Sequence, residues 1–265
     1  MNKEEIQLAI NLYKNGYSAT KIKEHLPYSQ HTILKYIKLN GIKIRSRAGY
    51  KKPFNENFFL SIDTEEKAYF LGLLMADGNV TEREKSQPLI RIELNRKDKY
   101  IIECFKQCLK TENKIEETAK NCCALRIHSN QMFSDLKKYG IVPNKTGHEV
   151  LPKTFIPENL IHHFIRGFFD GDGWVTNTHH GDRKNVLNLG FCGGKSIILS
   201  LNDFFFDKLK TKKLSVCDRG TWHCIIYGSQ SDVLKIYNFM YKDATIYLTR
   251  KKECFQSFYA NTEQA

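Results

Sequence analysis

Apolar residues recur at helical spacing along the first forty residues of the chain. Three segments show the pattern: one that stops before Gly16, a short one over Thr20–Leu26, and one that Ser29 can cap and that stops before Gly41. The spaced apolar residues are Ile6, Ala9, Ile10 and Tyr13, then Ile22 and Leu26, then Ile33, Leu34 and Ile37. The pattern predicts three helices in a helix-turn-helix arrangement.

A different apolar pattern, an unbroken stretch that ends in Asp-Gly, occurs twice in the rest of the chain. Residues Phe70–Gly78 and Ile165–Gly173 match each other, and their aspartates, Asp77 and Asp172, lie 95 residues apart. Each stretch has a glycine five residues before its aspartate, and small residues allow two helices to pack backbone against backbone. The repeat therefore predicts a close helix pair whose ends place the two aspartates side by side.

Alternating apolar and polar residues follow each of these helices and predict strands. In each copy two strands flank a polar loop, over Glu82–Pro88 and Asn177–Asn185, and a helix and two more strands follow. The predicted strands are Asn79–Thr81, Leu89–Asn95, Lys114–Thr118 and Ala124–His128, then Trp174–Thr176, Val186–Phe191, Leu214–Cys217 and His223–Tyr227; the helices between them are Asp98–Leu109 and Lys195–Leu209. The element order is αββαββα twice, an α+β fold in which each sheet has one apolar face and one polar face for a ligand.

Composition and charge narrow the class of protein. With 265 residues, 41% of them hydrophobic, the chain can bury a core, and it has no apolar run long enough for a transmembrane helix. The net charge is +12, and residues 1–53 carry eleven Lys or Arg against three Glu. A polyanionic partner is expected. Without a signal peptide we expect a protein that is not secreted, located in the cytoplasm of a bacterium or phage-infected host, or in an organelle.

The third helix and the segment after it offer residues suited to nucleic acid. This part resembles the helix-turn-helix of resolvases and transposases, and the alternative is a small basic bundle that binds protein. The expected contacts to base edges and phosphates are Gln30, His31, Thr32, Lys35 and Lys38 on the helix, and Arg45 and Arg47 in the basic arm that follows.

The two aspartates suggest chemistry as well as structure. Carboxylates that meet at the ends of paired helices repel each other, and hard divalent cations with oxygen ligands relieve that repulsion. Magnesium held there can bind phosphate oxygens and activate water for in-line displacement.

At these residues the chain resembles the LAGLIDADG homing endonucleases in their monomeric, two-motif form, over residues 57 to about 260. The resemblance implies saddle-shaped sheets that straddle duplex DNA. It also implies metal bound by Asp77 and Asp172, with backbone carbonyls of Ala76 and Gly171 as secondary ligands. The sixth motif position, usually acidic and mainly structural, is Met75 in the first copy and Asp170 in the second.

Further residues follow from the same resemblance. Lys145 and Lys251 occupy the positions of the active-site lysines, which polarise the attacking water or stabilise charge on the phosphate. Arg96 is a weaker catalytic candidate, placed near the water. The expected DNA contacts on the sheets are Arg91, Asn95, Arg126, His128, Asn188 and His223.

The resulting interpretation has three parts: a helix-turn-helix domain over 1–50 with a basic linker to about 56, and two LAGLIDADG subdomains over 57–150 and 151–265. The predicted function is a monomeric, site-specific endonuclease of double-stranded DNA, active in intron homing. It would use Mg²⁺, with Mn²⁺ or Ca²⁺ able to substitute for binding, and hydrolyse one phosphodiester in each strand to leave short 3′ overhangs. The alternatives are an intron RNA maturase and a non-cleaving DNA-binding regulator on the same scaffold.

Overall fold

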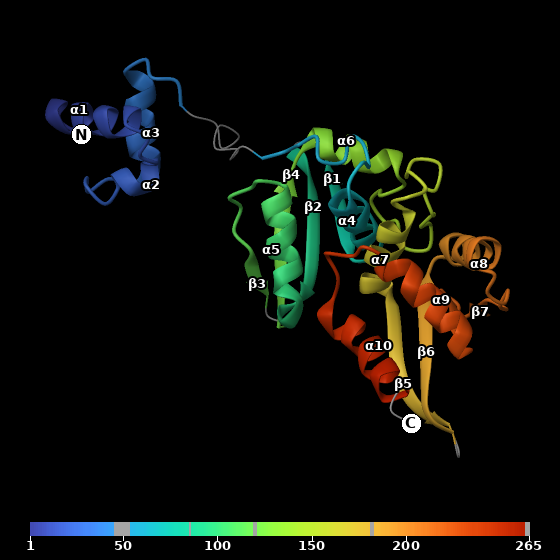
Figure 1. Ribbon diagram of the computed structural model, residues 1–265. Coiled ribbons are helices and arrows are strands. Elements are labelled where there is room, and N and C mark those ends of the chain that lie inside the picture. The colour runs from blue at the N-terminus through green and yellow to red at the C-terminus, as the bar shows by residue number, and fades with distance from the viewer. Residues whose placement is uncertain (45–53, 85, 119–120, 181–182, 263–265) are drawn as a thin grey trace. The chain divides into compact units, whose positions relative to one another are not determined.

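A computed structural model describes residues 1–44, 54–84, 86–118, 121–180 and 183–262. The chain divides into two compact units, Met1–Lys52 and Pro53–Ala265 (Figure 1). Arg45 and Arg47, two of the expected DNA contacts, lie outside the described residues. No described helix combines the length and the apolar character needed to cross a membrane.

The first unit consists of three helices around a small apolar core. They are α1 (Lys3–Lys14), α2 (Ala19–Ile22) and α3 (Gln30–Leu39). Ser18 and Ser29 cap the second and third by accepting a backbone hydrogen bond, as their position before each helix predicts. All three predicted helices are present, although α2 is shorter than Thr20–Leu26 because the amides of Glu24 and His25 bond back only three residues, to Lys21 and Ile22.

The second unit contains two four-stranded antiparallel sheets, with strand orders β1-β2-β4-β3 and β5-β6-β8-β7. The strands are β1 (Gly78–Arg83), β2 (Ser86–Asn95), β3 (Glu116–Thr118), β4 (Cys122–His128), β5 (Gly173–His180), β6 (Arg183–Gly193), β7 (Cys217–Asp218) and β8 (His223–Tyr227). The helices are α4 (Glu65–Ala76), α5 (Lys99–Cys108), α6 (Asn130–Lys138), α7 (Ile161–Asp172), α8 (Lys195–Leu209), α9 (Gln230–Tyr241) and α10 (Thr249–Thr262), with a 3-10 turn, η2, over Arg96–Asp98. The αββαββα order occurs twice as predicted, and α10 follows the second copy. The two-sheet α+β fold is confirmed.

The two strand pairs that follow the aspartates are longer than predicted. Pairing in the first continues to Arg83 and Ser86, and in the second to His180 and Arg183. The predicted loops over Glu82–Pro88 and Asn177–Asn185 are therefore mostly strand. Hydrogen bonds between the two backbones hold the strand pair together even where its side chains are polar. A prediction that relies on alternating apolar side chains does not detect this backbone pairing.

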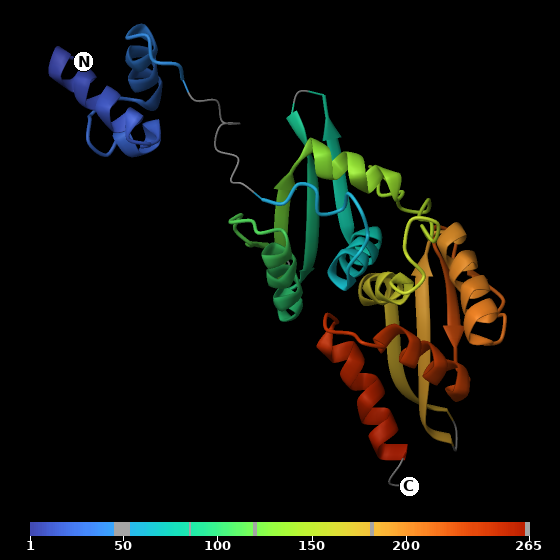
Figure 2. The same cartoon turned by 45° about the horizontal axis from the view of Figure 1, so that its top comes forward.

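Helices α4 and α7 pack against each other between the two sheets (Figure 2). A Cβ atom on Gly72 would lie 2.0 Å from the backbone oxygen of Phe164, and one on Gly167 would lie 2.0 Å from that of Tyr69. Only glycine fits at either position, so the predicted backbone-to-backbone approach is confirmed. We call this contact of α4 with α7 the helix seam.

The helix seam also buries a charged pair. The Arg166 guanidinium, fully buried on α7, donates a 2.6 Å hydrogen bond to Glu65 Oε1 on α4. It also donates to the backbone oxygens of Met240 and Ile246, at 2.7 and 2.8 Å. Arg166 therefore cross-links the two halves and the start of the segment that leads to α10.

Candidate active site and nucleic-acid face

The two repeated aspartates meet where the seam helices end. Asp77 is the C-cap of α4, and Asp172 is the last residue of α7. Gly171 lies directly against the partner helix end: a Cβ there would be 2.4 Å from Ala76 Cβ and 3.1 Å from Asp77 Oδ2. The repeat, the glycines and the helix ends thus bring Asp77, Ala76, Gly171 and Asp172 together.

This proximity changes the acidity of both carboxyl groups. Desolvation and the neighbouring charge of Asp77 raise the pKa of Asp172 to about 7, against the opposing effect of Lys145. Desolvation by the surrounding protein also raises the pKa of Asp77, although its side chain is open to solvent, while Lys251 and Lys145 oppose that rise. Two acids that resist ionising together form a site that a cation would stabilise.

The two expected active-site lysines lie at the same place. Lys145 Nζ donates to the backbone oxygen of Ala76 at 2.9 Å. Lys251 Nζ donates to the oxygens of Phe169, Asp170 and Gly173 at 2.6, 2.8 and 2.5 Å. Both side chains are buried, and desolvation lowers the pKa of each, that of Lys251 to about 8. Two cations therefore flank the aspartates.

The donor set fits a magnesium ion. Mg²⁺ is usually held by one or two carboxylates, with waters and substrate phosphates completing its shell. Among the described residues no three His, Cys, Asp or Glu side chains gather as a metal cage. Asp77 and Asp172, with nearby backbone oxygens, are thus the right kind of partial shell for an ion shared with a phosphate.

Arg96 is not brought to the aspartates. Its guanidinium pairs with Glu117 on β3, at the opposite edge of the sheet from β1, the strand that Asp77 precedes. The reason is local: β2 ends at Asn95, and η2 redirects the chain over Arg96–Asp98. The expectation of Arg96 near the attacking water is therefore corrected.

Several residues that support the site were not predicted. Asp170 Oδ2 accepts from the Tyr69 hydroxyl and from the Leu248 amide, each at 2.8 Å, and so ties α4 to the segment that carries Lys251. Arg250 pairs with the buried Asp98 at 3.2 Å. Because these partners are 78 to 152 residues apart, no local spacing could have indicated them.

Glu149 is a buried acid near the two aspartates. Its Oε2 accepts from the amides of Gly147 and Gly194, at 2.9 and 3.0 Å. The bond to Gly194 joins the Lys145 segment of the first half to the start of α8 in the second. Its charge opposes the fall in the pKa of Lys145 and adds to the rise in that of Asp172.

The expected DNA contacts of the first sheet lie on one open face. Arg91 on β2 is the register partner of Arg126 on β4, and both alternate with buried residues. Arg91 forms an ion pair with Glu93, and Arg126 forms one with Glu116. Asn95 and His128 are exposed at strand ends. The face is accessible and carries charges of both signs.

In the second sheet the outcome is divided. Asn188 is on the open face, where its Nδ2 donates to Thr178 Oγ1 at 2.8 Å. His223 alternates with the opposite, helix-covered face, in step with the buried Ile225. Its side chain is only 16% exposed and lies 3.8 Å from Asp218. The expectation that His223 faces a ligand is therefore wrong: β8 covers His223–Tyr227 as predicted, but His223 lies on the same face as the buried Ile225 and Tyr227.

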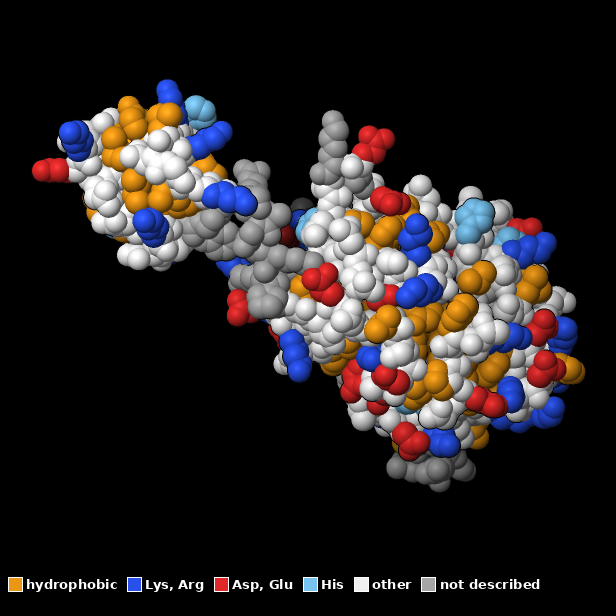
Figure 3. Space-filling model, turned by 90° about the horizontal axis from the view of Figure 1, so that it is seen from above, with side chains coloured by type: hydrophobic (Ala, Val, Ile, Leu, Met, Phe, Trp, Pro, Cys, Tyr) orange, Lys and Arg blue, Asp and Glu red, His pale blue; other side chains and the backbone are white. Residues whose placement is uncertain are grey.

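The candidate contacts of the three-helix unit lie on one side of α3. Gln30, His31, Lys35 and Lys38 are exposed, and Thr32 is half-buried. Gln30 Nε2 donates to Thr20 Oγ1 at 2.9 Å. Lys and Arg side chains are prominent on this unit in Figure 3, whereas charges of both signs mix with apolar groups on the second unit.

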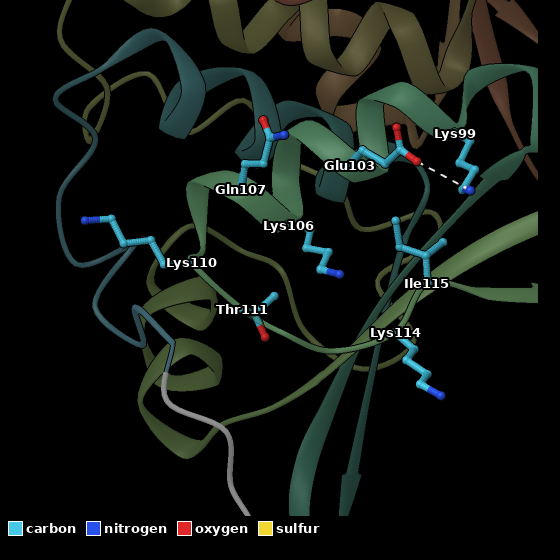
Figure 4. A pocket seen from close by; sticks show the side chains of 8 residues that line it. All are labelled: Lys99, Glu103, Lys106, Gln107, Lys110, Thr111, Lys114 and Ile115. Carbon is cyan, nitrogen blue, oxygen red and sulfur yellow. Dashed lines mark ion pairs between the residues drawn. The ribbon is translucent and has the colours of Figure 1, made fainter.

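A separate positively charged hollow lies between α5 and the segment before β3 (Figure 4). Its volume is about 550 Å³, and four of its lining residues are lysines: Lys99, Lys106, Lys110 and Lys114. Glu103 is the only acid of the lining and is engaged by Lys99 at 3.4 Å. The hollow therefore lacks the paired acids of a hydrolytic metal site, and the aspartate pair stands as the candidate active site.

Comparison with known proteins gives a clear result at the level of fold. No family model matches the chain, and no curated protein matches it. Among solved structures, the LAGLIDADG meganuclease I-AabMI bound to uncleaved DNA is similar at 16% identity and a TM-score of 0.53, covering 74% of this chain and 90% of that one. The LAGLIDADG homing endonuclease I-GzeII in complex with its DNA target is similar at 16% identity and a TM-score of 0.53, covering 77% and 91%.

A third similar structure is I-SmaMI bound to an uncleaved DNA target in the presence of calcium ions, at 15% identity and a TM-score of 0.53, covering 74% and 92%. These likenesses establish the fold, and they confirm the architecture that the repeated motif implied.

Proposed function

We propose that this chain is a monomeric LAGLIDADG homing endonuclease that cleaves both strands of a specific duplex DNA site. One observation carries the proposal: Asp77 and Asp172, from two halves of one chain, meet at the ends of helices that separate two sheets with open faces. A protein that only bound a polyanion would gain nothing from two carboxylates aimed at it.

Asp77 and Asp172 would hold divalent metal, with the Ala76 and Gly171 carbonyls close by, and the ion would supply charge neutralisation at the phosphate and an activated water. With a pKa of about 7, Asp172 must lose its proton before it can act as a ligand. Lys145 and Lys251 place two positive charges beside the aspartates, where they would stabilise the negative charge that develops on the phosphate. Hydrolysis of one bond per strand would leave short 3′ overhangs.

DNA recognition would be divided between the units. Residues of the open sheet faces, such as Arg91, Arg126 and Asn188, would contact the duplex on either side of the cut. The exposed residues of α3 and the basic segment with Arg45 and Arg47 would add contacts to flanking DNA. Such a division supports a long recognition site.

The test compares wild type with the double variant Asp77→Asn, Asp172→Asn on a library of duplex targets. We expect double-strand cleavage by wild type with Mg²⁺ or Mn²⁺, binding without cleavage in Ca²⁺, and no cleavage by the variant. Asp207→Asn, which changes an exposed acid on α8, is the matched control and should cleave normally. Equal binding by all three proteins with no cleavage would instead support a non-cleaving regulator or an RNA maturase.

A further inference from the structure

The two open sheet faces can be compared position by position, because the halves share one topology. Asn79 and Trp174 each stand two residues after the site aspartate. In the first sheet the row across the strands is Asn79, Arg91 and Arg126, and in the second it is Trp174, Gly190 and Ile226. The register thus equates Arg91 with Gly190 and Arg126 with Ile226.

The neighbouring row shows the same contrast. Glu93 and Glu116 both align with Ala124 in the first sheet, whereas Cys192 and Cys217 both align with Cys224 in the second. We call Arg91, Glu93, Glu116 and Arg126 the charged cluster, and Trp174, Gly190 and Ile226 the apolar cluster. Equivalent places on the two faces therefore have opposite chemical character.

The charged cluster offers hydrogen-bond donors and acceptors that are held in fixed positions. Each arginine is held by one glutamate, in the pairs Arg91–Glu93 and Arg126–Glu116. The four side chains are 28% to 47% exposed, so a ligand can reach them. In a major groove arginine donates two hydrogen bonds to guanine, and glutamate accepts from the amino group of cytosine. The cluster therefore matches G·C base pairs.

The apolar cluster depends on a missing side chain. A Cβ on Gly190 would lie 2.1 Å from Trp174 Cζ2, so the indole ring covers the strand where the first sheet has Arg91. Ile226 is 41% exposed beside it. An apolar surface in a major groove contacts the methyl group of thymine, an apolar group that G·C pairs lack.

We propose that the two halves read half-sites of different composition, with G·C pairs under the charged cluster and thymine-containing A·T pairs under the apolar cluster. These would be the base pairs near the cut, since both rows begin two residues after an aspartate. The inference rests on the proposed function and specifies its substrate: the bases that each inner half-site presents to its own sheet.

The experiment is selection of duplexes from a randomised library by the full-length protein in Ca²⁺. Wild type should enrich G·C pairs in one inner half-site and thymine in the other. Arg91→Ala with Arg126→Ala should lose the G·C preference by about tenfold to a hundredfold in the first half-site only. Ile226→Asn should weaken the thymine preference in the second half-site only, and Ile226→Arg should add a preference for guanine there.

Lys106→Ala with Lys114→Ala is the control, because it removes two positive charges from the hollow in Figure 4 and should leave both preferences unchanged. The inference is overturned if wild type enriches the same bases in both half-sites, or if the arginine variant changes both equally. Failure of wild type to enrich any duplex would instead contradict the proposed endonuclease itself, so the two failures differ.

Discussion

At the scale of single residues, Asp172 is the group of the site whose ionisation most reduces the stability of the folded protein. Its side chain is packed beside Asp77 with too few donors to compensate, so the folded protein binds a proton there that the unfolded chain releases at a pKa near 3.8. This stabilisation is complete below the unfolded pKa of about 3.8 and is lost as the pH rises through the folded pKa of about 7.

We therefore predict that Asp172→Asn gains stability relative to metal-free wild type as the pH rises from 6 to 8.5. The comparison isolates Asp172 from Lys251, whose lowered pKa of about 8 acts on stability in the opposite direction. One pKa unit corresponds to about 1.4 kcal/mol, so the variant should be more stable at pH 8.5 by on the order of 1–3 kcal/mol. Thermal unfolding at both pH values, with EDTA present, measures the difference. Asp207→Asn should retain the wild-type pH dependence, and a stability difference between Asp172→Asn and wild type that does not grow over this range would contradict the assignment.

Substitutions of the two lysines should have similar effects on cleavage rate but different effects on stability. Lys251 bonds three backbone oxygens at the end of α7, whereas Lys145 bonds one at the end of α4. Lys251→Met removes one donor from each of three backbone oxygens, of which the Phe169 oxygen keeps the Gly173 amide as a partner. It should cost about 2 kcal/mol of unfolding free energy, against about 1 kcal/mol for Lys145→Met. Both should slow single-turnover cleavage by on the order of 10²- to 10³-fold.

Urea unfolding and single-turnover rates, measured on the same preparations, test this pair of variants. Lys106→Met, on the surface of α5, serves as the control and should change neither quantity. Equal losses of stability in the two site variants would show that the three contacts of Lys251 do not support the fold as described.

The residues of the site differ in how visible they are in the sequence. Asp77 and Asp172 could be identified because a repeated local motif contains them. Arg96 could not be excluded, because whether it turns toward the aspartates depends on where β2 ends. Asp170 was visible as a departure from symmetry, but its bond to Tyr69 on the other half depends on how α4 and α7 cross.

At the scale of elements, the helix seam determines the position of Asp77 and Asp172. The aspartates at the two helix ends meet because the helix axes approach closely at Gly72 and Gly167. The obstacles to a larger residue there are backbone atoms, which cannot rotate away. The position of the active site and the stability of the fold therefore depend on the same contact.

Gly72→Ala should destabilise the protein by about 3 kcal/mol or more, since its Cβ would overlap the Phe164 backbone. A variant that still folds should also cleave more slowly, because displaced helix ends move Asp77 away from Asp172. Chemical unfolding followed by cleavage at a temperature where the variant is folded measures both effects. Gln107→Ala, an exposed change on α5, should be neutral, and a Gly72→Ala protein as stable as wild type would refute the tight crossing.

Strand and helix types were predictable from periodicity, but strand limits were not. The seam helices are strongly apolar, and strands such as β2 alternate regularly. The long hairpins were underestimated because their polar ends are held by main-chain pairing, which has no side-chain signature. His223 was misplaced for a related reason: one residue of register decides which face a side chain joins.

At the scale of the whole molecule, the chain has two separate apolar cores, one in each unit. The sequence indicated this division through its charge, because residues 1–53 hold +8 of the net +12. How the halves of the second unit meet required long-range contacts that no local pattern records. Under the proposed function, the first unit would add affinity for DNA and the second would carry out cleavage.

A shortened chain of residues 53–265 should therefore fold and cleave, but bind its target more weakly. Each phosphate contact that is lost should reduce the slope of log K against log salt by about 0.9. Binding isotherms at several salt concentrations, with cleavage of saturated DNA as the second readout, test this. An unchanged salt slope would mean that the first unit does not contact DNA.

The pair of Arg166 and Glu65 makes the two sides of the helix seam chemically different, because α7 supplies the cation and α4 supplies the anion. At the positions that the repeat equates with them, α4 has Leu71 and the α7 half has Leu160. Two copies of the second half pressed together would bury two guanidinium groups without the Glu65 carboxylate that accepts a hydrogen bond from Arg166, which is unfavourable. Two copies of the first half would lack the guanidinium altogether. Cut apart and mixed, the halves should thus select each other and reject copies of themselves.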